Sequence, residues 1–358
     1  MFEMQIKIFS KKILDKLWNI TDNVPHEIIS QKKGKPFEHL KPDFNSKEVN
    51  ESYSNDNNKW FHEEFIKYYK NKITIEPDYG YCLIEFNKVI KSSVFFEKLK
   101  PSFPRYVLNL FKNKTYLDKA ILFDGKVGCN YFHFFSDTIS KLELIKEIPD
   151  YKNLPLIISR KTFEKKYFQY LFENTDIKKY KWIIQEDNEY IKTNGIYILK
   201  PMPYKKEYFS KIKSLVVPDN INNKKNIFLN RSIKTGRYIE NFYELKEILI
   251  KYNFEVIDTD GADFDYQFNL FNSAKNLISV HGAGNTNLIF TNSNLRFLEI
   301  MPGNRISCQY YWLAKTMETD YYDVVVGGNL PHVGSYPEEG FYLNPEEFEK
   351  AIIKMLNY

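Results

Sequence analysis

The hydrophobic positions along the chain form two series of short apolar runs, and each run is followed by a stretch that suits a helix. The first series begins near residue 72, and its apolar runs predict strands at 119–125, 154–160, 181–185 and 195–200. The intervening stretches predict helices over 129–148 and 162–174. Strands that alternate with helices favour βα units around a parallel sheet.

The second series starts after a joint rich in Pro, Asn and Lys at 216–225. Its apolar runs predict strands at 226–231, 254–258, 276–280, 296–301 and 323–327. The stretches between them predict helices at 238–252, 263–274, 285–291, 308–317 and 344–356. The last helix has Asn344 as its N-cap and Pro345 in its first turn.

Two such series with a joint between them predict an α/β protein with two doubly wound domains that face a cleft. We place the first domain at 71–217 and the second at 218–358, including the C-terminal helix. Residues 1–70 form an N-terminal extension, in which the polar stretch 19–60 is expected to be loop-like. In doubly wound sheets, ligands bind beyond the carboxyl ends of the strands.

The composition is that of an ordinary globular protein. Of the 358 residues, 43% are hydrophobic and 27% are charged, which excludes global disorder. The basic excess, 51 − 46 = 5 charges, is spread along the chain without a long basic tract, so nucleic acid is not an expected partner. A weak attraction to anionic membrane surfaces or to phosphorylated ligands is the more modest interpretation.

The cysteines and the N-terminus indicate the compartment. Three widely spaced cysteines suit neither a disulfide framework nor a zinc site, and their odd number fits a reducing environment. The first 20 residues carry charges throughout and no small-residue cleavage site, so we expect neither a signal peptide nor a spanning anchor. Their apolar positions suit a helix against protein or a membrane surface. We therefore expect a cytoplasmic protein, with peripheral contact at the inner face of the membrane left open.

Arginine is rare in this chain and unevenly placed. Only six of the 51 basic residues are arginines, and four of the six lie between residues 231 and 305. The planar guanidinium suits bidentate binding of phosphate or carboxylate groups. The clustering indicates a phosphate site in the second domain, and ordinary salt-bridging arginines are an equal alternative.

The clearest motif is HGAGNTN, which begins at His281 between a predicted strand and a short helix. Gly282 and Gly284 allow the backbone a positive φ or close approach to a ligand, and the helix N-terminus offers free N–H groups to a phosphate. Three further side chains can add donors: Asn285, Thr286 and Asn287. The match to GxGxxG is partial, which argues against a nicotinamide cofactor. A strand–helix turn without a ligand is the alternative.

A second loop, NRSIKTGR at 230–237, follows another predicted strand. Arg231 and Arg237, with Ser232 and Lys234 between them, make it a basic loop. Both loops belong to one edge of one sheet and could clamp a diphosphate from two sides. Glu299 ends the next strand and could accept hydrogen bonds from ribose or sugar hydroxyls. A cap, or a salt bridge to Arg305, is about equally expected for Glu299.

In the first domain, Asn130, His133 and Asp137 are spaced to share one face near a helix start. A histidine and a carboxylate one turn apart can act as base and orienter. Spacing alone favours a capped, hydrogen-bonded surface pair. Asp263 and Asp265 suggest a metal–nucleotide site, but acidic residues are also common at a helix start.

These motifs, in this order, resemble glycosyltransferase family 61 over roughly residues 120–315. The strings that carry the resemblance are NYFHFFSD at 130–137, NRSIKTGR at 230–237, the block 263–290 that ends in HGAGNTNLIF, and RFLEIMPG at 296–303. The stretch 226–302 is the more specific part, and residues 1–70 resemble nothing we recognise. Two positions depart from the family pattern, Asn285 where an apolar residue is usual and Asn230 where serine is common.

The resemblance implies a GT-B fold with two Rossmann-like domains, the first for the acceptor and the second for the donor nucleotide. It implies inverting transfer from a nucleotide-sugar, usually a UDP-sugar, without an obligatory metal or cofactor. By the same resemblance, the diphosphate would be held by Arg231, Arg237, Gly284, Asn285 and Asn287. Glu299 would bind the ribose or the donor sugar, and Gln267 and His281 would line the cleft. The acceptor would be a glycan or a lipid-linked oligosaccharide in bacterial capsule or surface-polysaccharide synthesis.

An inverting transfer requires a base for the acceptor hydroxyl, and we predict His133 as base with Asp137 as orienter. The reverse assignment is close behind. Arginines and a helix N-terminus can stabilise the leaving diphosphate without a cation. Two alternatives stay open: another enzyme on similar domains, such as a nucleotide-sugar epimerase or a phosphotransferase, and a non-catalytic subunit of polysaccharide assembly.

Overall fold

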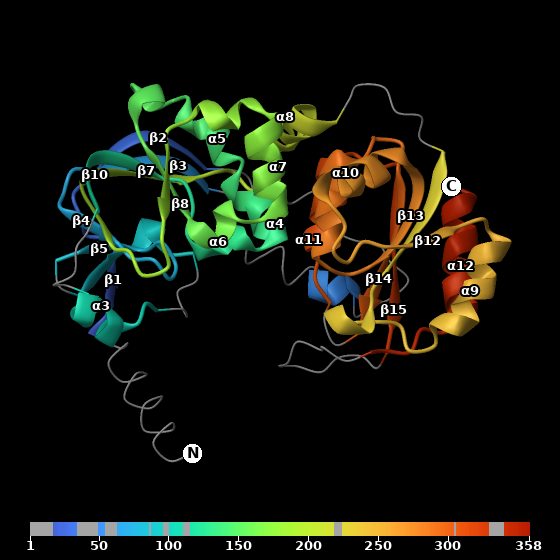
Figure 1. The fold of residues 1–358 in the computed structure, drawn as a ribbon. Helices are drawn as coiled ribbons and strands as arrows, with labels where there is room; N and C mark the ends of the chain where they lie inside the picture. Colours follow the sequence, from blue (N-terminus) through green and yellow to red (C-terminus); the bar gives the residue numbers. More distant parts are fainter. Residues whose placement is uncertain are drawn as a thin grey trace, which may run out of the picture. The chain divides into compact units, whose positions relative to one another are not determined.

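The chain divides into two compact units, each described here by itself (Figure 1). Unit 1 comprises Met1–Gly34 and Glu63–Pro203, and unit 2 comprises Lys35–His62 and Tyr204–Tyr358. The computed structural model describes residues 17–33, 49–53, 63–85, 87–95, 100–109, 115–217, 224–303, 306–328 and 340–358. The helix expected within the first 20 residues lies almost wholly outside this description.

Unit 1 is built on a mixed sheet of ten strands. The strands are β1 (Asn19–Thr21), β2 (Glu27–Lys33), β3 (Glu63–Tyr69), β4 (Ile73–Ile75), β5 (Cys82–Ile84), β6 (Lys88–Ile90), β7 (Thr115–Leu122), β8 (Leu156–Ser159), β9 (Trp182–Gln185) and β10 (Ile191–Lys200). The main path is β1-β6-β5-β4-β10-β7-β8-β9, and β3 pairs with both β10 and β2. Buried aliphatic side chains of β4, β7, β8 and β10 form the core around this sheet.

This sheet differs from the doubly wound parallel sheet that the sequence predicted for the first domain. The predicted strands β7, β8, β9 and β10 do pair in parallel. Both β3 and β4, however, lie antiparallel to β10, and β4, β5 and β6 follow one another as antiparallel neighbours. The sequence pattern missed this half of the sheet, in which the strands β1, β4, β5 and β6 have three residues each and are too short to show a periodicity.

The loop-like interpretation of residues 19–60 is wrong where the structure describes them. This stretch supplies β1 and β2 to the sheet of unit 1, and residues 49–53 are helical and belong to unit 2. Strand β2 is mostly exposed and reads EIISQKK, so it lacks the buried alternation that marks a strand. Its pairing with β3 fixes it instead, and an ion pair of 3.2 Å joins Lys32 to Glu64 across the pair.

The helices of unit 1 are short, and the long helix expected over 129–148 is broken in three. The α-helices are α3 (Phe103–Asn109), α4 (Tyr131–His133), α5 (Lys141–Ile145), α6 (Arg160–Phe163) and α7 (Lys166–Asn174). The 3₁₀ turns are η2 (Lys91–Ser93), η3 (Lys126–Cys129), η5 (Tyr151–Asn153) and η6 (Asp176–Lys179). Between α4 and α5, a π-helical turn, η4 (Phe134–Thr138), widens the helix, and the Ile139 N–H donates to the Phe134 carbonyl at 2.8 Å.

Unit 2 contains the parallel sheet that the second apolar series predicted. Its strands are β11 (Lys225–Asn230), β12 (Glu255–Asp258), β13 (Ala274–Val280), β14 (Arg296–Pro302) and β15 (Tyr321–Gly327), in the spatial order β12-β11-β13-β14-β15. All neighbouring strands are parallel. The helical segments are α8 (Lys206–Val216), η7 (Ile233–Thr235), α9 (Phe242–Lys251), α10 (Phe264–Ser273), η8 (Ala283–Phe290), α11 (Gln309–Thr316) and α12 (Pro345–Leu356). In Figure 1, α9 and α12 cover one face of the sheet, and α10 and α11 cover the other.

The unit boundary lies at Pro203/Tyr204 and not at the expected 217/218. Helix α8, which the sequence analysis did not predict and whose residues we expected in the first domain, belongs to unit 2. The Lys213 ammonium fixes it there, because it donates to the Thr291 carbonyl at 2.8 Å and to the Asn292 side chain at 3.0 Å. The composition of the 216–225 joint placed the boundary after α8, whereas the chain passes between the units before α8.

The C-terminal helix begins as predicted. The Asn344 side chain caps α12 by accepting from the N–H groups of Glu346 at 2.9 Å and Glu347 at 3.2 Å, and Pro345 occupies the first turn. Its buried face packs against α9 and against strands β14 and β15. Among the described helices, none is long and apolar enough to span a membrane.

Candidate active site

The two loops predicted in unit 2 lie side by side at the carboxyl edge of its sheet. Strand β11 comes first in the chain of this unit, yet β12 and β13 lie on either side of it. The strand order therefore reverses between β11 and β13, and parallel sheets bind their ligands at such a switch point. The loops that follow β11 and β13 are 231–237 and 281–287, so their predicted adjacency is confirmed.

Arg231 folds over its own loop and lies against Gly282 of the other loop. Its Nε donates to the Gly236 carbonyl at 2.9 Å and its Nη2 to the Thr235 carbonyl at 2.7 Å. A Cβ atom on Gly282 would lie 2.0 Å from Arg231 Nη1, so this glycine permits the close approach. At Gly284, an added Cβ would make only an ordinary contact of 3.5 Å with Leu229, so the packing of this unit does not require glycine there.

Arg237 ties the first loop to the second. Its Nη1 donates to the carbonyl of His281 at 3.0 Å. The backbone reaches this position through two left-handed residues, Gly236 with φ 66° and Arg237 with φ 55°. The hydrogen bonds of Arg231 and Arg237 orient the two guanidinium groups at this edge of the sheet.

His281 and Glu299 form a buried pair beneath the second loop. His281 Nδ1 lies 2.6 Å from Glu299 Oε1, and both side chains are fully buried. The Tyr322 hydroxyl donates to the other carboxylate oxygen, and Asn285 Nδ2 donates to Oε1 at 3.4 Å. An ionised carboxylate only accepts, so these donors place the proton of a neutral His281 on Nδ1.

The structure excludes one of the two alternative roles predicted for Glu299. The carboxylate is not a helix cap, and the Arg305 considered as its partner lies outside the described residues. Its described partners all belong to unit 2 and hold the second loop and its strand. Direct contact of Glu299 with ribose or donor sugar stays a prediction.

The remaining side chains of the second loop also point into the unit. Asn287 is buried, and its Nδ2 donates to the Gly284 carbonyl at 3.1 Å and to Gln267 Oε1 at 3.2 Å. Gln267, on α10, donates in turn to the Ala262 carbonyl at 3.1 Å. Thr286 Oγ1 is buried and has no hydrogen-bond partner among the described residues. The structure thus brings together two residues that the sequence analysis assigned to separate roles, Gln267 and Asn287.

Ser232 and Lys234 lie on the outer part of the first loop. The Ser232 hydroxyl donates to the carboxylate of Asp260, in the loop that follows β12, and Lys234 is exposed. Sequence reasoning missed Asp260. Its place after the strand that neighbours β11 was the available signal, because the carboxyl ends of neighbouring parallel strands lie at the same edge of a sheet.

In unit 1, the structure brings His133 and Asp137 together across the π-helical turn. His133 Nδ1 lies 2.9 Å from Asp137 Oδ2, and the Ser136 hydroxyl donates to the same oxygen at 2.8 Å. Asn130 is the N-cap of α4, and its side chain accepts from the His133 N–H at 3.3 Å. The pair is therefore capped and hydrogen-bonded, as its spacing alone predicted. The imidazole ring and the carboxylate are both partly exposed.

Comparison with known families decides the class of the protein. Residues 131–298 match the family model described as Glycosyltransferase 61. The protein is a glycosyltransferase. The matched region begins one residue after Asn130 and ends one residue before Glu299, so it contains the His133–Asp137 pair and both loops of unit 2. No curated protein matches the sequence.

Beneath its His133–Asp137 pair, the glycosyltransferase holds two charged groups that sequence reasoning missed. Asp124 follows β7 and is buried, and it accepts from the Gly128 N–H at 2.9 Å and the Ser159 hydroxyl at 3.1 Å. Burial raises the pKa of Asp124 from 3.8 to about 6. Lys141 donates to the Phe123 carbonyl at 2.7 Å, and burial lowers the pKa of its ammonium, against the attraction of Asp124 and Asp137. For Asp124, the available signal in the sequence was an acidic residue directly before a glycine, Gly125, at the end of an apolar run.

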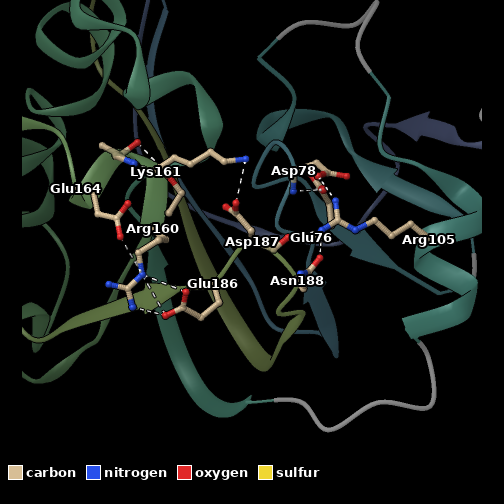
Figure 2. Close-up of polar contacts among 11 residues, drawn as sticks. Glu76, Asp78, Arg105, Arg160, Lys161, Glu164, Glu186, Asp187 and Asn188 are labelled. Carbon is tan, nitrogen blue, oxygen red and sulfur yellow. Dashed lines mark hydrogen bonds and ion pairs between the residues drawn. The ribbon is translucent and has the colours of Figure 1, made fainter.

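The arginines of unit 1 follow the salt-bridge alternative. Figure 2 shows Arg160 bonded to Glu186, with Glu164 beside it, and Lys161 bonded to Asp187. Arg105 reaches Asp78, Asn188 and the backbone of Asp187 in the same way. Carboxylates compensate both arginines, so we place neither in the active site of the glycosyltransferase.

Asp263 and Asp265 occupy ordinary helix positions. Asp263 is the N-cap residue of α10, and Asp265 lies in its first turn. Within the described ranges, no three His, Cys, Asp or Glu side chains come together as a metal-binding group.

Proposed function

We propose that this glycosyltransferase moves a sugar from a UDP-sugar to a hydroxyl group of a glycan acceptor, with inversion at the anomeric carbon. The single observation that carries the donor site is the meeting of two phosphate-suited loops at the switch point of the sheet in unit 2. Uridine as the base, and an acceptor in surface-polysaccharide synthesis, are supported by the family resemblance alone.

The donor diphosphate would lie against Arg231 and Arg237 and the start of η8. Guanidinium groups bind phosphate oxygens by paired hydrogen bonds, and free N–H groups at a helical start add favourable dipoles. The contacts of the two arginines with Thr235, Gly236 and His281 hold their side chains at this edge before a ligand arrives. A preorganised site loses less side-chain entropy on binding.

The base would be His133. Its Nδ1 side faces Asp137, whose Oδ2 already accepts from two donors, so the imidazole Nε2 is the atom that can take a proton from the acceptor. The acceptor oxygen then bonds to the anomeric carbon, and the bond from that carbon to the diphosphate breaks. The leaving UDP takes the electron pair, and Arg231 and Arg237 stabilise its charge.

The test is calorimetric titration with UDP, GDP, CMP, ADP and NAD, in Mg²⁺ and again in EDTA. We expect UDP to bind in both buffers. Binding of NAD alone would overturn the proposal, and binding that EDTA abolishes would overturn metal independence. Silence with every nucleotide would favour a non-catalytic subunit.

Arg237→Ala sharpens the test, with Arg296→Ala as its matched control. Both arginines belong to unit 2, and each donates to a backbone carbonyl at 3.0 Å, Arg237 to that of His281 and Arg296 to that of Leu356. Arg296 begins β14 and therefore lies at the amino end of this strand. Loss of a charged hydrogen bond should weaken UDP binding about 10- to 100-fold in Arg237→Ala. Arg296→Ala should bind UDP like the native protein, and equal affinities in all three would remove Arg237 from the site.

A further inference from the structure

A segment from the N-terminal part of the chain reaches the buried base of the donor site. Residues 49–53 are helical and belong to unit 2, although the described chain before and after them belongs to unit 1. Val49 and Tyr53 are both fully buried there. Tyr53 packs its ring against Tyr311, with centroids 5.6 Å apart, and its hydroxyl lies 3.2 Å from the hydroxyl of Tyr322.

The hydrogen bonds of the two tyrosines are directed toward Glu299. Burial and the Glu299 carboxylate raise the pKa of both Tyr53 and Tyr322 well above the usual value of a tyrosine, so both hydroxyls keep their protons. Tyr322 gives its one proton to Glu299 Oε2. The bond between the two hydroxyls therefore has Tyr53 as its donor, because Tyr322 has no second proton to give.

The chain of hydrogen bonds continues into the second loop. Glu299 holds His281 Nδ1 at 2.6 Å, and the carbonyl of His281 accepts from Arg237 at 3.0 Å. The Tyr322 hydroxyl and the imidazole both donate to the Glu299 carboxylate, so the strength of the bond from His281 depends on Tyr322 and, through it, on Tyr53. Tyr53 thus lies at one end of a path whose other end is the diphosphate-binding arginine.

We propose that Tyr53 is a positioning residue of the donor site, acting through Tyr322 and Glu299 on His281. This inference rests on the proposed function, since it takes the His281 loop as part of the nucleotide site. It gives residues 49–53 a task that their sequence did not indicate: they complete the support of a loop made more than two hundred residues later.

The test compares Tyr53→Phe, Tyr322→Phe and the double variant, with Tyr69→Phe as control. Phenylalanine keeps the packed ring and removes only the hydroxyl. Tyr69 is a buried tyrosine of unit 1 whose hydroxyl lies 2.9 Å from the Ser92 hydroxyl, so its variant loses a comparable bond away from the donor site. Thermal unfolding of all four variants measures the purely structural cost.

Calorimetry with UDP gives the first readout. We expect about tenfold weaker binding for Tyr322→Phe, about threefold for Tyr53→Phe, and no loss in the double variant beyond that of Tyr322→Phe. Tyr69→Phe should bind UDP like the native protein. Native affinity in Tyr53→Phe, or losses that add in the double variant, would overturn the inference while leaving the proposed function standing.

The imidazole N–H proton of His281 gives a second readout that needs no nucleotide. A buried Nδ1–H bonded to a carboxylate resonates at low field in proton NMR, and Glu299→Gln identifies it among the six histidines. We expect this signal to shift in Tyr53→Phe and to stay in place in Tyr69→Phe. If native protein binds no UDP, the proposed function fails, and an unmoved signal in Tyr53→Phe shows separately that Tyr53 does not act on His281.

Discussion

The protein contains two histidine–carboxylate pairs that differ in almost everything but their chemistry. His133 and Asp137 come from one helical segment, and their side chains are 23% and 28% exposed. His281 directly follows strand β13, Glu299 lies in the middle of the neighbouring strand β14, and both side chains are 0% exposed. In each pair the carboxylate approaches Nδ1, at 2.9 Å and 2.6 Å respectively. The exposed pair can exchange a proton with a substrate, whereas the buried pair can only hold its surroundings in place.

Replacing the exposed histidine should have the largest effect of any change considered. We expect His133→Ala to lower the rate of sugar transfer about 10²- to 10⁴-fold, because removing a general base costs about that much. The affinity for UDP should stay at the native value, since the histidine belongs to unit 1. Single-turnover kinetics and calorimetry on the same preparation measure both quantities. Loss of UDP binding in this variant would contradict the assignment of proton transfer to the His133 pair and of nucleotide binding to unit 2.

Replacing the buried histidine should affect stability instead. His281→Ala leaves Glu299 buried without its imidazole partner, and the free energy of unfolding should fall by about 3–5 kcal/mol. In His133→Ala the partly exposed carboxylate can hydrate, so the loss should stay below about 1 kcal/mol. Urea denaturation of both variants gives the comparison. Similar losses in the two would mean that burial does not separate the pairs.

The buried carboxyl beneath the exposed pair should reveal itself through pH. Burial raises the pKa of Asp124 from 3.8 to about 6, so the folded protein favours the protonated form. The stability that this protonation contributes is complete below pH 3.8 and is lost as the pH rises through about 6. Relative to Asp124→Asn, native protein should lose about 2–3 kcal/mol of unfolding free energy between pH 4 and pH 7. A difference that is constant across urea titrations at pH 4, 5, 6 and 7 would contradict the burial of this group.

The smallest expected effect separates two glycines of one loop. In Gly282→Ala the new methyl group must displace the Arg231 guanidinium, and we expect UDP to bind roughly three- to tenfold more weakly. Gly284→Ala meets only Leu229 at van der Waals distance, so its fold should stay intact. Calorimetry on Gly284→Ala then reports on the ligand alone. Weaker UDP binding there would mean that the diphosphate lies on Gly284, and native binding would place it nearer Arg231.

Much of unit 2 could be predicted because four of its five strands are mainly buried and most of its helices are longer than those of unit 1. The apolar runs identified every strand of its sheet, and adjacency of the loops followed from the rule for parallel strand ends. The hydrogen-bond network of Glu299 could not be predicted, since Tyr322 bonds to it from 23 residues away and Tyr53 contacts Tyr322 from 269 residues away in the sequence. In unit 1, spacing found the His133–Asp137 contact, but no pattern indicated the π-helical turn or the buried charge of Lys141.

The crossing of residues 49–53 into unit 2 also sets an order of events during synthesis. Tyr53 leaves the ribosome 269 residues before Tyr322, the residue whose hydroxyl it contacts in the folded protein. At about 5–20 residues per second, roughly 15–55 s pass before its partner exists. Most of unit 1 is made within that interval, so its sheet can form while the segment waits. A truncation that removes the first 53 residues would therefore damage both units at once. Unit 1 would lose strands β1 and β2 from its sheet, and unit 2 would lose the buried segment 49–53.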